Sequence, residues 1–161
     1  MIRALALLIA LAPGLAEALS CTPWGVTDAY LSADASPRDH IIVRGALQFD
    51  ERLWPQVDLN RQDETPPLTL IPGRIEGHAF SRNGPDVPFA IDVTVQVACF
   101  GPWCAGPAQG DVLAFVERTD DGHAVSFDPC GGTVFARPTA DQIKAVTRCL
   151  KGRRCPATGF Q

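Results

Sequence analysis

The sequence has little of what nucleic-acid recognition and metal binding need. It contains one tyrosine and three histidines, and its formal charge is -4 at pH 7. An acidic surface repels phosphate backbones, and single strands are usually bound by several aromatic rings beside cations. The histidines, His40, His78 and His123, lie in different segments without the paired spacing of metal ligands. We therefore expect no nucleic-acid partner, no metal site and no cofactor.

Catalytic signatures are missing too. The chain has no Gly-x-Ser-x-Gly, no His-Glu-x-x-His and no glycine-rich phosphate loop. Carboxylates gather in one polar stretch, which a solvated loop explains without catalysis: Asp50, Glu51, Asp58, Asp63 and Glu64. We therefore expect that the protein is not an enzyme, and an extracytoplasmic enzyme is kept as a second alternative.

Long apolar runs are also lacking. The chain opens with Arg3 and an apolar run from Ala4 to Leu11, whereas about 20 apolar residues are needed to cross a bilayer. This start is typical of an export signal. We expect residues 1–20 to be a cleaved signal peptide, with cleavage after Ala18 or after Ser20. The protein is then periplasmic or extracellular, without a transmembrane segment.

A lipid on Cys21 is a further alternative for the mature N-terminus. Lipid-anchor signals favour leucine three residues before the cysteine and a small residue two before it. Here Ala18 and Leu19 stand in the reverse order. We therefore expect no lipid anchor.

Six cysteines follow the expected signal, and an even number in an exported chain favours three disulfides. Cys99 and Cys104 flank a Gly-Pro turn that brings two thiols within bonding reach. A bond between Cys149 and Cys155 would fold the tail back. The alternative, a zinc site of these four thiolates, requires wider spacings than the usual zinc knuckle has. Cys130 closes a predicted hairpin and is placed to tie it to the N-terminus.

Alternating apolar residues predict five strands in the mature chain. In the clearest, four β-branched residues from Ile91 to Val97 occupy one face and polar residues the other. In another, Val43, Gly45 and Leu47 share a face. The five predicted strands are Ile41–Phe49, Leu68–Ser81 with a bulge or bend at Pro72-Gly73, Ile91–Val97, Val112–Arg118 and His123–Asp128.

Two helical segments flank the strands. Thr27 to Ala33 favours a short helical turn. Thr139 and Gln142 form a capping pattern, and an apolar face follows that comprises Ile143, Val146, Cys149 and Leu150. The sequence predicts a mainly β fold: a five-stranded Greek-key barrel of the OB type with a C-terminal amphipathic helix, stapled by disulfides. We expect one domain over residues 21–155 and a frayed tail over 156–161.

Five short stretches carry a family resemblance that covers most of residues 21–150. They are Cys21–Pro23, Asp28–Asp34, Ile41–Phe49, Gly110–Phe115 and Asp128–Cys130. Their layout resembles the netrin-like module and, within it, the N-terminal domain of tissue inhibitors of metalloproteinases. In those inhibitors an N-terminal cysteine chelates the zinc of the protease through its amine and carbonyl, and disulfides hold that cysteine in place.

The resemblance implies that Cys21 takes this chelating role and that Thr22 faces the protease pocket. It also implies a clamp from Cys21 to Cys130, with Cys104 as the alternative partner of Cys21. The preferred set of disulfides is then Cys21–Cys130, Cys99–Cys104 and Cys149–Cys155.

The chain departs from that family at two positions. Pro23 stands where a second cysteine is usual, and Leu31 stands where another family cysteine is expected. A start at Leu19 would also leave Cys21 without a free amine. Metalloprotease inhibition is therefore the first alternative, and a module that binds a protein partner is the leading interpretation.

The loop between the first two predicted strands, Asp50 to Pro67, is the expected contact surface of such a module. Leu53, Trp54 and Val57 are its candidate anchors, since a few large side chains provide most of the binding energy at interfaces. For Trp54 the alternative is that the indole folds back onto the barrel.

Overall fold

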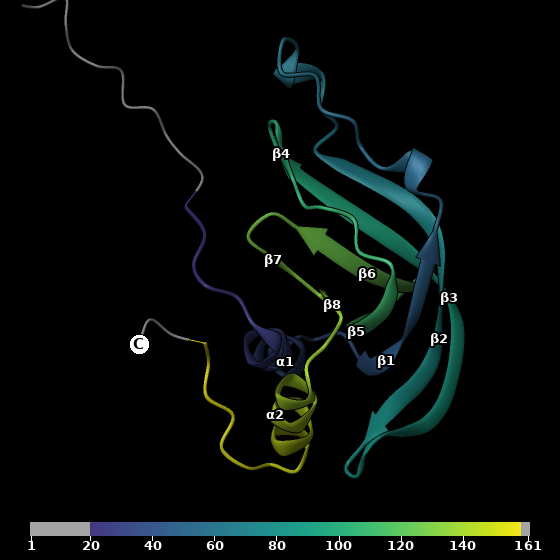
Figure 1. The fold of residues 1–161 in the computed structure, drawn as a ribbon, viewed down its shortest axis with the longest axis vertical. Coiled ribbons are helices and arrows are strands. Elements are labelled where there is room, and N and C mark those ends of the chain that lie inside the picture. Colours follow the sequence, from purple (N-terminus) through teal and green to yellow (C-terminus); the bar gives the residue numbers. More distant parts are fainter. Residues whose placement is uncertain (1–19, 159–161) are drawn as a thin grey trace, which may run out of the picture.

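The computed structural model describes residues 20–158, so nearly all of the expected signal peptide lies outside the described residues. The fold is mainly β, as the sequence predicts (Figure 1). In chain order the elements are α1 (Val26–Ala35), β1 (His40–Phe49), η1 (Glu51–Leu53), η2 (Gln62–Glu64), β2 (Leu68–Ser81), β3 (Gly84–Phe100), β4 (Trp103–Cys104), β5 (Gly110–Thr119), β6 (Gly122–Asp128), β7 (Gly131–Gly132), β8 (Val134–Ala136) and α2 (Ala140–Leu150).

Five long strands close into a ring. β1 pairs antiparallel with β2 and β5, β2 pairs with β3, and β5 pairs with β6. A parallel contact between β3 and β6 completes the ring. The prediction of five strands and a C-terminal helix is thus confirmed, and three short strands that the sequence did not indicate, β4, β7 and β8, extend the sheet.

Two paired glycines bring the backbones of β1 and β2 close together. Gly45 lies opposite Gly77 in the register of the two strands. A Cβ on Gly45 would stand 2.2 Å from the carbonyl oxygen of Glu76, and a Cβ on Gly77 would stand 2.2 Å from that of Arg44. Real Cβ contacts are never this short, so only glycine fits on either strand here.

Apolar side chains pack on both sides of β5. The interior of the ring holds a cluster that includes Val43, Leu47, Ile71, Ile75, Val93, Val95, Val97, Val112, Ala114, Val116, Val125 and Phe127. The alternate residues of β5, Leu113 and Phe115, instead join a second cluster under the helices, with Val26, Ile42 and Val146. The two helices therefore cover the outside of β5 (Figure 1).

Both helices begin with capping interactions. The backbone N–H of Gln142 donates to the hydroxyl of Thr139, and the side chain of Gln142 accepts from the Thr139 N–H, as the sequence predicts. At α1 the Asp28 carboxylate accepts the N–H of Gly25 at 2.9 Å. α1 is longer than the predicted helical turn, since it continues to Ala35.

Three disulfides are present, and they are the pairs that the sequence favours: Cys21–Cys130, Cys99–Cys104 and Cys149–Cys155. They are consistent with an exported protein. The first closes a loop of 109 residues, whereas the others close loops of 5 and 6. In the chain-entropy account a loop of the first size stabilises the fold by about 5 kcal/mol, against about 2 kcal/mol for the short ones. The N-terminal bond therefore contributes most.

Two expectations about local structure need correction. β2 runs through Pro72 and Gly73 without a change of register against β3, and the irregularity lies between Ala79 and Phe80. The β1 register ends at the pair Phe49 and Gly73, so Pro72 pairs with β3 alone. A residue without an N–H is tolerated at such an edge position.

The expected frayed tail is also shorter than predicted. Thr158 donates its N–H to the Asp28 carboxylate at 2.9 Å, and its hydroxyl lies 3.2 Å from that of Thr27. Residues 156–158 therefore return to the start of α1, and residues 159–161 lie outside the described part of the chain. Within residues 20–158, no helix has the length and apolar character that crossing a bilayer requires.

A substitution at Gly45 tests the close approach of β1 and β2. We expect Gly45→Ala to lower the free energy of unfolding by about 2 kcal/mol or more, because the new methyl group overlaps the β2 backbone. Gly106→Ala is the matched control, since a Cβ at Gly106 meets nothing within 4 Å. Urea denaturation followed by circular dichroism measures both. Equal stability of the two variants would contradict the close approach of the β1 and β2 backbones.

Candidate functional site

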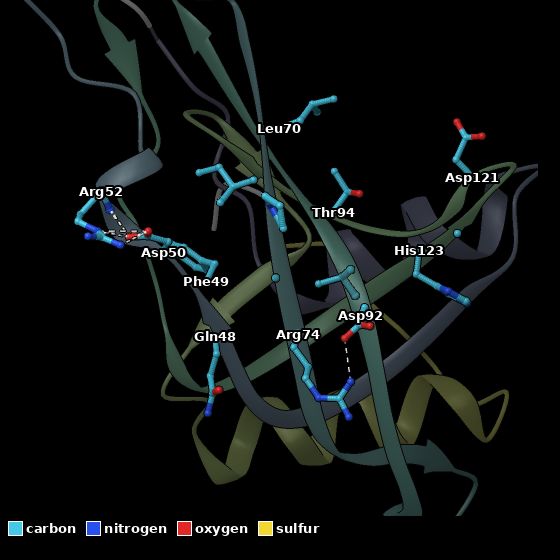
Figure 2. Close-up of a pocket in the computed structure, with 15 residues that line it drawn as sticks. Gln48, Phe49, Asp50, Arg52, Leu70, Arg74, Asp92, Thr94, Asp121 and His123 are labelled. Atoms are coloured by element: carbon cyan, nitrogen blue, oxygen red, sulfur yellow. Dashed lines mark hydrogen bonds and ion pairs between the residues drawn. The ribbon is translucent and has the colours of Figure 1, made fainter.

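A hollow of about 1010 Å³ lies on the outer face of β2 and β3 (Figure 2). The start of the β1–β2 loop, at Asp50 and Arg52, borders it on one side. Asp121 and His123, from the β5–β6 hairpin, border it on the other. Two loops and two strands thus frame one open surface.

One end of this surface is charged, and its arginines are paired with carboxylates. Arg74, on β2, donates to Glu76 at 2.6 Å and to Asp92, on β3, at 2.8 Å. These hydrogen bonds raise the pKa of the guanidinium above its usual value. At the border, hydrogen bonds from Arg52 hold the pKa of Asp50 below its usual value. Both cations already have carboxylate partners, so this end offers an anionic ligand no unpaired cation.

The other end of the face carries no charged side chain. The outward positions of β2, β3 and β4 form an uncharged strip, which we define as Leu68, Leu70, Pro72, Thr94, Gln96, Ala98, Phe100 and Trp103. The exposed fractions are 58% for Leu70, 45% for Phe100 and 49% for Trp103. Phe100 and Trp103 are direct partners across the β3–β4 hairpin, so their rings stand on the same side. The strip therefore presents large apolar side chains to solvent.

Trp54, an expected binding anchor, is instead part of the core. Its side chain is 7% exposed, its ring stacks on Phe49 at 5.3 Å, and it meets Phe127 edge-on at 5.1 Å. The indole N–H donates to the carbonyl of Ala105 at 3.1 Å. The anchor role is wrong for Trp54 because the indole closes one end of the ring interior, which was the alternative.

The other two expected anchors, Leu53 and Val57, are more exposed than Trp54. Leu53 is 51% exposed and Val57 is half-buried. The start of the loop is fastened to the chain before β5, since the side chain of Gln109 accepts the N–H of Phe49 and donates to Glu51. Leu53 is thus exposed and available for contact.

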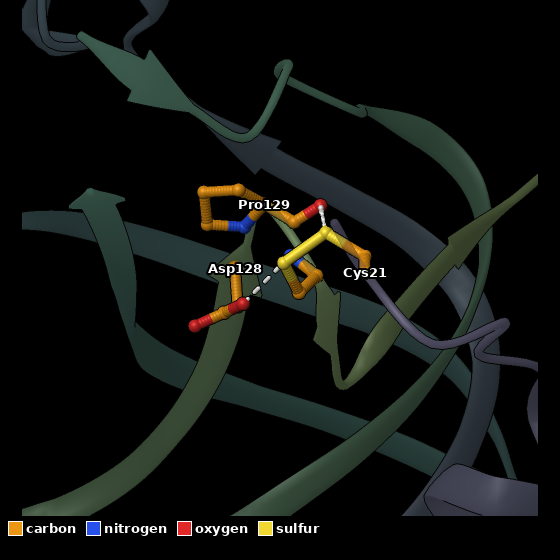
Figure 3. The surroundings of a disulfide bond; sticks show 4 residues. Cys21, Asp128 and Pro129 are labelled. Atoms are coloured by element: carbon orange, nitrogen blue, oxygen red, sulfur yellow. Dashed lines mark hydrogen bonds between the residues drawn. A yellow bond between two sulfur atoms is a disulfide. The ribbon is translucent and has the colours of Figure 1, made fainter. Parts of the chain in front are cut away.

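The N-terminal segment is held against the end of β6 (Figure 3). Cys21 is bonded to Cys130, whose backbone N–H donates to the carboxylate of Asp128 at 2.8 Å. Trp24 donates its indole N–H to the carbonyl of Gly132 at 2.9 Å. Cys21 and Thr22 are exposed. The contacts of this segment are with the end of β6 and the residues after it, and none of these contacts joins Thr22 to the expected site in the β1–β2 loop.

The titratable residues do not form a metal centre in the described part. Among residues 20–158, no three His, Cys, Asp or Glu side chains are grouped so that they would hold a metal ion. His40 is paired with the backbone of Arg38 and lies near Glu117, whereas His123 lies beside the hollow.

Comparisons with protein-family models, with curated proteins and with solved structures find no match for this chain.

The uncharged strip is the feature that sequence reasoning missed. Leu68 and Leu70 alternate with Thr69 and Ile71, so this part of the strand has large apolar side chains on both faces; of these four residues, Ile71 is the one that is fully buried. A second apolar face on a strand was the available signal. It indicates either a covering element or an exposed contact surface.

Trp54→Ala tests the corrected role of the indole. We expect a loss of about 3–5 kcal/mol in the free energy of unfolding, since the substitution leaves a large cavity beside Phe49 and Phe127. Leu53→Ala, at the neighbouring exposed position, should change stability by less than about 0.5 kcal/mol. Chemical denaturation measures both. A Trp54→Ala variant as stable as Leu53→Ala would show that the indole does not close the core.

Proposed function

We propose that the protein is an exported, disulfide-stapled binding module of the OB type that takes up a protein partner on the outer face of β2 and β3. The order of the ring, β1-β2-β3-β6-β5, supports the OB interpretation, because it comprises five strands closed by one parallel contact. In OB folds the second and third strands and the loops 1–2 and 4–5 bind ligands. The corresponding parts of this chain frame the hollow in Figure 2.

The uncharged strip is the observation that carries this proposal. Centres of protein interfaces are rich in aromatic side chains and poor in charge, and contiguous exposed apolar patches mark contact sites. The strip contains Leu70, Phe100 and Trp103 without a charged neighbour inside it. Single-stranded nucleic acid would require cations along the strip, which favours a protein partner.

The test is a comparison of variants in partner capture. The purified chain is used to isolate binding proteins, and the dissociation constant of each purified candidate is then measured. We expect Leu70→Glu and Trp103→Ala each to weaken binding by about 30-fold, as for interface hot spots, because one buries a charge and the other removes an aromatic anchor. Val87→Glu is the control, since Val87 is 49% exposed on β3 outside the strip.

Two outcomes of this comparison would contradict the proposal. A partner that tolerates both strip variants, or loses affinity equally with Val87→Glu, contradicts the assigned surface. Circular dichroism of each variant establishes that the fold is intact.

The second candidate function is metalloprotease inhibition through Cys21. The favouring observation is the disulfide to Cys130 together with the Trp24 hydrogen bond, which fix an exposed Cys21 at the edge of the ring. A free amine and carbonyl held there would be positioned to fill the open coordination site of a catalytic zinc.

An assay of two N-terminal forms tests this candidate. Protein that begins at Cys21 should inhibit a zinc endopeptidase acting on a fluorogenic peptide. Protein with one alanine placed before Cys21 should not inhibit, because its cysteine lacks the free amine. Absence of inhibition by both forms, or equal inhibition by both, rules out the mechanism.

A further inference from the structure

Among residues 20–158 the cations other than Arg137, an exposed residue between β8 and α2, fall into two groups according to their ion pairs. Six arginines of the strands and of the segments that connect them have a carboxylate oxygen within 4.0 Å. This first group comprises Arg38, Arg44, Arg52, Arg61, Arg74 and Arg118. Their charge is largely compensated on the protein itself.

The second group gathers where α2 ends. We call it the basic end and define it as Arg82, Lys144, Arg148, Lys151, Arg153 and Arg154. All six are exposed. Of these six cations only Lys144 has an ion pair within residues 20–158, at 3.5 Å to Asp141, and both of these side chains are over three-quarters exposed. The charge of the basic end is therefore open to an external anion.

The basic end is concave and comes from three segments. One hollow, of about 470 Å³, is lined by Lys144 and Arg148 of α2 and by the β2–β3 turn. An adjoining hollow, of about 420 Å³, is lined by Arg82 and by one carboxylate, that of Asp34 on α1. Lys151 and Arg153 line both hollows, so five of the six cations, all but Arg154, surround one continuous region. Figure 1 places α2, the loop after it and the β2–β3 turn at the same end of the molecule.

The loop that carries these cations is held rigidly. The disulfide between Cys149 and Cys155 closes it. The backbone N–H groups of Lys151, Gly152 and Arg153 donate to carbonyls of the last turn of α2, at 3.2, 2.8 and 3.2 Å. A loop that is ordered before binding loses less conformational entropy when it binds.

Compensation of the helix dipole does not account for the whole group. Cations in the last turn stabilise the negative end of a helix, which explains Arg148 and Lys151. Arg82 belongs to the β2–β3 turn, and Arg154 lies beyond the end of the helix. These residues extend the positive charge away from the helix axis.

We propose that the basic end docks on an anionic phospholipid surface. The cations are spread over three segments, so they match several phosphates side by side rather than one bound anion. The whole chain has a formal charge of -4, so concentrating uncompensated cations at one end orients the molecule toward a negative plane. Leu31, 37% exposed, lines the hollow beside Arg82 and supplies an apolar contact at the headgroup level.

Vesicle sedimentation tests the proposal. The purified chain should bind vesicles that contain phosphatidylglycerol and not vesicles of phosphatidylcholine alone, and high salt should release it. A triple variant, Arg148→Gln with Lys151→Gln and Arg153→Gln, should lose about 100-fold in partitioning, since each cation contributes roughly fivefold.

The matched control removes the same charge elsewhere. Arg44→Gln with Arg61→Gln and Arg118→Gln changes the net charge equally but removes only cations that have ion pairs. Exposed ion pairs contribute little to stability, so this variant should stay folded and should retain vesicle binding. Melting curves followed by circular dichroism check the fold of both triple variants.

Four results would overturn the proposal: no binding to anionic vesicles, equal binding to neutral vesicles, equal losses in the two triple variants, or binding to soluble heparin without binding to vesicles. The result is independent of the proposed partner surface. Leu70→Glu should leave vesicle binding unchanged, and the basic-end variant should leave partner capture unchanged.

Discussion

The close pairing of β1 and β2 is the constraint on which the rest of the structure depends. At Gly45 and Gly77 the two backbones approach so closely that neither strand has room for a Cβ. In the same sheet β3 pairs in parallel with β6, which closes the ring. Closure covers strand edges that would otherwise be open and encloses the valine-rich interior. Every surface feature of the molecule is positioned by that closed frame.

Much of the frame was predictable, because burial alternates along a strand with the same period as its side chains. The interior positions Val43 and Leu47 followed directly from this pattern, as did the apolar face of α2. The length of β3 did not follow, because Pro85 and Pro88 argue against a strand. They are tolerated since this part of β3 pairs with β2 alone, whereas β6 joins only at residues 94–97. The closed ring determines which strand edges remain unpaired, and this cannot be predicted from the local sequence.

The candidate site was less predictable for the same reason. Trp54 stands in a polar, proline-rich loop, and only the fold reveals that a gap between Phe49 and Phe127 receives its ring. The sequence around Leu70 is typical of a buried strand because it is apolar on both faces. In the described part of the chain, however, no element covers the outer face of the strand at Leu70. Arg82 is 62 or more residues from the other basic-end cations and joins them only when the β2–β3 turn meets the end of α2. Composition gives the number of cations, whereas the fold decides which of them meet a carboxylate.

The arrangement of the two surfaces bears on how they would act together. The uncharged strip extends to β4 at one end of the long axis, and the basic end lies at the other (Figure 1). A membrane attached at the basic end would hold the strip away from the lipid and leave it open to a partner. Because the two surfaces share no residue, each contributes to binding without competing for the same side chains. The ring between them, closed by the pairing of β3 with β6, fixes their separation, so attachment at one end would orient the other.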